Sequence, residues 1–106
     1  MAWFILFIAG IFETAWAVSM KYSNGFTKIY PTIFTFSAMA LSVFLLSISL
    51  KSLPVGTAYA VWTGIGAFGT AVIGILLFGE SKELIRLFFI SLIVIGIVGL
   101  KLFSRN

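Results

Sequence analysis

Charge is scarce in this chain, and cysteine and histidine are absent. Only 9% of the 106 residues are charged, whereas soluble proteins carry about 25%. The lack of cysteine and histidine excludes disulfides, thiolate or imidazole metal ligands, a cysteine nucleophile and a Ser-His-Asp triad. We therefore expect no metal site, no cofactor and no enzyme activity.

Apolar residues make up most of what is present. They account for 61% of the chain, and its mean hydropathy is +1.19. A transmembrane helix needs about 20 apolar residues, so the chain has room for four such helices and for no separate soluble domain. The composition predicts an all-α membrane protein in which residues 1–106 form a single transmembrane domain.

Four apolar runs are the predicted membrane spans, and short polar turns separate them. A soluble helix bundle would show a polar face on each helix, whereas the second run shows only scattered serine and threonine. The first run lacks the basic start and the cleavage site of a signal peptide. The predicted helices cover residues 2–20, 31–50, 54–78 and 84–103.

The basic residues are almost evenly divided between the two ends of the predicted bundle. They are scattered singly between apolar runs, which favours contact with lipid headgroups over binding of nucleic acid. Two turns share one side, with Lys21, Lys28, Lys82 and Arg86, and the other side has Lys51, Lys101 and Arg105. Because lysine and arginine in short loops set orientation, the chain can insert either way up. We expect an antiparallel homodimer, whose inverted symmetry is typical of transporters; a heterodimer would fit the same balance.

Glu13 is the only acidic residue inside a predicted span. A helix rises about 1.5 Å per residue, which places Glu13 roughly 17 Å into a hydrocarbon core of about 30 Å. A carboxylate near the midplane is costly unless a cation or proton satisfies it. We therefore predict that Glu13 binds substrate and protons, in preference to a permanently protonated packing role.

Helical spacing and depth bring further groups toward Glu13. In the first span Gly10 and Trp16 share its face, and in the third Tyr59, Trp62 and Gly66 share a face. Ser42 and Trp62 lie at the same predicted depth, about 12 Å from the side of the N-terminus. Carboxylate, hydroxyl and aromatic faces suit a planar cation. The predicted pocket residues are Gly10, Trp16, Met39, Ser42, Tyr59 and Trp62.

Glycines in the third and fourth spans have two possible roles. Gly64 and Gly66 lie in mid-span, where glycine permits either a hinge or close helix packing. Gly96 and Gly99 lie three residues apart with no binding groups beside them. We interpret the face of Gly96 and Gly99 as a packing surface for a second copy.

The motifs together resemble the small multidrug resistance family. The resemblance rests on Glu13, on Trp16-Ala-Val and Lys21-Tyr-Ser, and on the stretch Lys51-Ser-Leu-Pro-Val-Gly-Thr-Ala-Tyr-Ala-Val-Trp-Thr-Gly-Ile-Gly66. Gly79-Glu-Ser81 and Gly99-Leu-Lys101 are similar to its guanidinium exporter subtype. Broad multidrug exporters have glycine at both ends of a packing motif in the fourth helix, whereas Phe89 holds the earlier position here and Gly96 the later.

The resemblance implies an antiparallel homodimer in a bacterial plasma membrane. Its paired Glu13 residues would bind either protons or one guanidinium-type cation, and proton entry would drive export. The rivals are an exporter of bulky quaternary ammonium compounds, which would use the same glutamate, and a membrane scaffold subunit that does not transport. Transport of guanidinium itself distinguishes a guanidinium exporter from the first rival. Loss of activity on replacement of Glu13 distinguishes it from the second.

Overall fold

A computed structural model describes residues 1–103 of the chain. It contains four helices: α1 (Ala2–Tyr22), α2 (Ile29–Ser49), α3 (Val55–Phe78) and α4 (Leu84–Leu102). All four are long and apolar enough to cross a membrane, which confirms the predicted all-α membrane fold. Arg105, which entered the count of basic residues, lies outside the described part.

The helix ends differ from the predicted ends by two residues at most. Helix α2 begins at Ile29, so Pro31 is its third residue. Proline fits there because the first four N–H groups of a helix have no intrahelical partner. The chain turns between α1 and α2 with positive φ at Asn24, Gly25 and Phe26. Gly79 ends α3 in the left-handed conformation, at φ 66°, which glycine adopts without strain.

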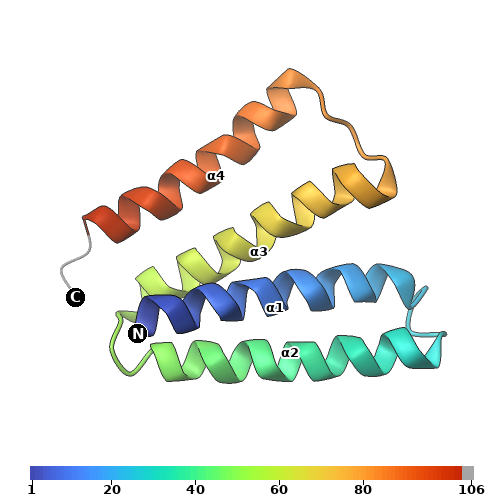
Figure 1. Ribbon diagram of the computed structural model, residues 1–106, viewed down its shortest axis with the longest axis horizontal. Coiled ribbons are helices and arrows are strands. Elements are labelled where there is room, and N and C mark those ends of the chain that lie inside the picture. Colours follow the sequence, from blue (N-terminus) through green and yellow to red (C-terminus); the bar gives the residue numbers. More distant parts are fainter. Residues whose placement is uncertain (104–106) are drawn as a thin grey trace.

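The helices form a flat layer in the spatial order α2, α1, α3, α4 (Figure 1). The principal extents of the molecule are 44 × 35 × 17 Å, so its shortest dimension is little more than one helix diameter. A single layer of helices cannot enclose a core. Each helix therefore leaves a large apolar area for lipid or for another protein chain.

The seam between α1 and α2 is made by small residues. Thr35, Ser42 and Ser49 are seven residues apart and fully buried, and Ala38 lies among them. The Oγ of Ser19 in α1 donates to the carbonyl of Pro31 in α2, at 2.9 Å. Small residues let helix backbones approach closely within a membrane. Three of the scattered serine and threonine residues of this span therefore lie on its inner face.

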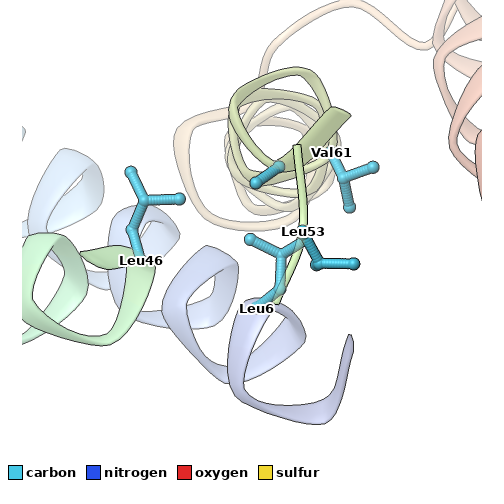
Figure 2. Packing of buried hydrophobic residues seen from close by; sticks show 5 residues of the cluster. Leu6, Leu46, Leu53 and Val61 are labelled. Carbon is cyan, nitrogen blue, oxygen red and sulfur yellow. The ribbon is translucent and has the colours of Figure 1, made fainter. Parts of the chain in front are cut away.

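A small apolar cluster lies where the start of α1 meets the α2–α3 connection. Leu6, Leu46, Leu53 and Val61 belong to this cluster (Figure 2). In contrast, no residue of α4 is buried. The backbone of α4 approaches that of α3 alone, although the Lys101 ammonium lies over the Trp3 ring of α1, 5.2 Å from its centroid.

Candidate functional site

Glu13 lies in the middle of α1, where α1 crosses α3. Gly66 of α3 is buried against the Glu13 side chain, and a Cβ at Gly66 would collide with the Glu13 carboxylate. The missing side chain of Gly66 therefore makes the space that the carboxylate occupies. This contact brings together two of the residues named from sequence.

Two polar atoms on this part of α1 are buried without a partner. They are Oε1 of Glu13 and Nε1 of Trp16, and neither makes a hydrogen bond with the described residues 1–103. An unsatisfied polar group costs several kcal/mol in a membrane interior. One is an acceptor and the other a donor, so each keeps an unused hydrogen-bonding capacity.

Ser42 and Trp62 form a hydrogen-bonded chain that joins three helices. Nε1 of Trp62 in α3 donates to Oγ of Ser42 at 2.9 Å, and this hydroxyl donates to the carbonyl of Ala9 in α1 at 2.7 Å. Ser42 is fully buried, so the chain fixes the indole at a defined place. Ala9 precedes Glu13 by about one helical turn, so this chain meets α1 one turn before Glu13.

Tyr59 extends the aromatic wall beyond Trp62. The two rings are 5.6 Å apart between centroids and tilted by 51°, a favourable arrangement for aromatic pairs. Tyr59 is 57% exposed, so its phenol is open to lipid, ligand or a second chain. Met39 is half-buried one turn before Ser42, and its part in the pocket stays a prediction.

Gly10 and Thr14 hold α1 close to α3 on either side of Glu13. A Cβ at Gly10 would overlap the side chain of Ile65 in α3, so Gly10 contacts Ile65 and makes an approach of the helices possible. Oγ1 of Thr14 donates to the carbonyls of Gly10 at 3.3 Å and Gly66 at 3.4 Å. The sequence reasoning missed Thr14, although a polar residue beside Glu13 and four residues after Gly10 was a usable signal.

The remaining glycines fall on two different surfaces. A Cβ at Gly64 would press on Ile93 and Ile97 of α4, so Gly64 contacts that helix. Helix α3 continues without interruption through Gly64 and Gly66, and their hinge role stays a prediction. Gly96 and Gly99 have open space around their Cβ positions, so their face of α4 is uncovered within the protomer.

Three of the cavities formed by the described residues lie along α1, and Glu13 lines none of these three. An apolar cavity of about 340 Å³ lies among α1, α3 and α4, and another of about 340 Å³ lies among α1, α2 and α3. The third, of about 440 Å³, lies between α1 and α3 and reaches the α3–α4 connection. The protomer thus presents its unpartnered carboxylate oxygen outside these cavities, in the contact with α3.

Comparison with known proteins gives a consistent result along the whole chain. A family model described as Small Multidrug Resistance protein matches residues 1–93. A guanidinium exporter of Yersinia pseudotuberculosis is 61% identical over 104 residues, which cover 98% of this chain and 100% of that protein. A guanidinium exporter of Proteus vulgaris is 57% identical with the same coverage. A guanidinium exporter of Salmonella typhimurium is 58% identical over 102 residues, 96% of this chain and 97% of that protein.

Proposed function

Because the chain belongs to the small multidrug resistance family of transporters and is a multi-pass protein of the bacterial inner membrane, we propose that it exports guanidinium and small guanidinyl cations in exchange for protons. The similar proteins named guanidinium exporter support the choice of cation. The proposal treats residues 1–106 as one transport domain without a cofactor.

The buried, unpartnered Oε1 of Glu13 is the observation that carries the proposal. A guanidinium ion is planar and offers paired N–H donors, so it matches a carboxylate through two parallel hydrogen bonds. The indoles of Trp16 and Trp62 can add cation–π attraction where water is excluded. A small planar cation therefore satisfies both the charge and the hydrogen-bonding capacity of Glu13.

Competition at Glu13 is sufficient to couple the two fluxes. A protonated carboxyl does not attract a cation, and a carboxylate that holds guanidinium has less affinity for a proton. If Glu13 is exposed to the two sides of the membrane in turn, protonation of Glu13 on one side releases the substrate. Binding of substrate on the other side then releases the protons. Lower pH should accordingly weaken guanidinium binding, because more of the carboxyl is protonated.

An antiparallel homodimer completes the site in this proposal. The protomer is a single layer 17 Å thick whose α4 has no buried residue. A second copy in the opposite orientation would cover the face of Gly96 and Gly99 and bring its own Glu13 to the same depth, since Glu13 lies near the midplane. The balanced lysine and arginine count permits both insertions.

Glu13→Gln tests the proposal in vesicles that contain the purified protein. We expect the wild type to take up guanidinium when an imposed gradient drives protons out of the vesicles. We also expect it to move protons when guanidinium is added. Glu13→Gln keeps the shape of the side chain and removes its charge, so both fluxes should fall to the level of empty vesicles. Raising the pH should tighten guanidinium binding in the wild type and leave the variant unaffected.

Glu83→Gln is the matched control, because Glu83 is exposed at the start of α4. It should transport like the wild type. Guanidinium-driven proton flux in Glu13→Gln would contradict the proposal. Transport of a bulky quaternary ammonium compound without guanidinium would favour the broad exporter, and a lack of transport of both would favour the scaffold subunit.

A further inference from the structure

Glu80 lies in the α3–α4 connection and is held against the last turns of α3. Its backbone N–H donates to the carbonyl of Gly74 at 3.1 Å, after Gly79 has reversed the chain. Gly74 is buried, and a Cβ there would collide with the Glu80 carboxylate. The absence of a side chain at Gly74 therefore leaves a notch in α3 that receives this carboxylate.

Arg86 pairs with the same carboxylate. Its Nη2 donates to Oε1 of Glu80 at 2.7 Å, and its Nη1 donates to the carbonyl of Ser81 at 2.9 Å. The side chains of Arg86 and Glu80 are 32% and 47% exposed. Ion pairs this accessible to water are weak, so a competing cation can exchange with the Arg86 side chain.

The cavity of about 440 Å³ connects this pair with the surroundings of Glu13. Its lining includes Ala17 and Lys21 of α1, and Thr70 and Gly74 of α3. In α1, residues 13, 17 and 21 repeat every four positions, and in α3, residues 66, 70 and 74 do the same, so each set follows one helix face. The cavity therefore begins one turn beyond Glu13 and Gly66 and ends at Glu80 and Arg86.

Glu80 is the only acidic side chain that lines this cavity. Two cationic side chains share the lining: Arg86, which is paired with Glu80, and Lys21, whose ammonium lies 5.8 Å from the Phe78 ring centroid. A diffusing cation that enters between α1 and α3 therefore meets one carboxylate before Glu13. That carboxylate already binds a guanidinium group, the one at the end of Arg86.

We propose that the Glu80 carboxylate is an entry site for guanidinium-type cations, and that the Arg86 side chain occupies it between transport cycles. This inference rests on the proposed function. A free guanidinium ion displaces the Arg86 group from Glu80, because the two ions offer the same planar N–H donors. It then moves along the cavity as far as Ala17 and Thr70, one helical turn from Glu13 and Gly66. In an antiparallel dimer each membrane surface has one such site.

Glu80→Gln and Arg86→Lys separate this role from a structural one. Glu80→Gln removes the entry site, so the KM for guanidinium should rise by about two- to fivefold, the range that a weak exposed charge pair supports. Arg86→Lys keeps the positive charge, and so keeps the lysine and arginine count that sets orientation. It replaces the planar guanidinium group of Arg86 with an ammonium, which competes less well with free guanidinium for Glu80. The KM for guanidinium should therefore fall. Both variants should keep the maximal rate within about twofold.

The measurement is guanidinium uptake into vesicles over a range of concentrations, with Glu83→Gln as the control. Glu83 belongs to the same connection, does not line the cavity and loses the same charge, so its KM should equal that of the wild type. Opposite changes of KM in Glu80→Gln and Arg86→Lys support the inference. Changes in the same direction, no change in either variant, or an equal rise in Glu83→Gln would overturn it. Guanidinium transport by the wild type tests the proposed function separately.

Discussion

Helices α1 and α4 are similar in length, at 21 and 19 residues, but have opposite surroundings. Helix α1 lies between α2 and α3, and it has four buried residues and hydrogen bonds to both neighbours. Helix α4 lies against α3 alone and has no buried residue. The difference indicates that α1 takes more of its packing from its own chain than α4 does, and that α4 depends more on contacts from outside the protomer.

Gly96→Leu tests most directly whether a second copy covers α4, and of the three changes it should have the largest effect on transport. The open space at Gly96 accommodates leucine within the protomer, so helix content should not change. If a second copy covers this face, the larger side chain should separate the dimer and reduce guanidinium transport by at least about tenfold, equivalent to about 1.4 kcal/mol. Cross-linking in vesicles and light scattering in detergent measure the oligomeric state.

The control for Gly96→Leu is Gly56→Leu in α3, where the Cβ position is equally open. It should leave the dimer intact. A dimer and a transport rate like those of the wild type in Gly96→Leu would mean that the face of Gly96 is exposed to lipid, which would contradict the proposed contact.

Gly66→Ala tests the packed region, where the same kind of change meets atoms of the protomer itself. The new methyl group would collide with the Glu13 carboxylate, which is the movable end of a flexible side chain. We expect the protein to fold and to dimerise with a displaced carboxylate, and guanidinium transport to fall by about tenfold, or about 1.4 kcal/mol. Transport assays in vesicles, together with helix content by circular dichroism, measure both outcomes.

Gly56→Ala offers the same substitution at an open position of α3 and should behave like the wild type. Full activity in Gly66→Ala would show that the position of the Glu13 carboxylate against α3 is unimportant for transport.

Ser42→Ala should have the smallest effect of the three. It removes the hydrogen bond to the Ala9 carbonyl and leaves Nε1 of Trp62 without an acceptor. Interhelical hydrogen bonds in membranes are worth about 0.6 kcal/mol on average, and up to about 1.7. We expect the stability against denaturing detergent to fall by about that amount, and guanidinium affinity to fall by a few-fold as the indole loses its fixed position.

Ser47→Ala is the matched change on the exposed side of α2, where the hydroxyl donates only to the carbonyl of Phe44 in its own helix. An equal loss in Ser47→Ala would mean that the effect of Ser42→Ala does not come from the chain that joins the three helices.

The relative depth of residues along the spans could be predicted because depth in a membrane follows from residue counting. Glu13 was identifiable as the single acidic residue within a predicted span, and Ser42 and Trp62 were placed at one depth. The structure joins Ser42 and Trp62 by a hydrogen bond. Thr14 and the pairing of Glu80 with Arg86 were not predicted. Both depend on which neighbour a side chain meets across helices or through a turn, and residue counting gives no information on rotation or loop path.

The sequence by itself determined the number of helices, the membrane as their solvent and the isolation of one carboxylate in it, because these follow from composition and from the rise of a helix. Only the tertiary structure decided what each glycine faces: Gly66 meets Glu13, Gly64 meets α4, and Gly96 meets open space. The same residue type serves three purposes because the effect of a missing Cβ depends on which atoms lie next to it. The rotation and the order of the helices determine those neighbours.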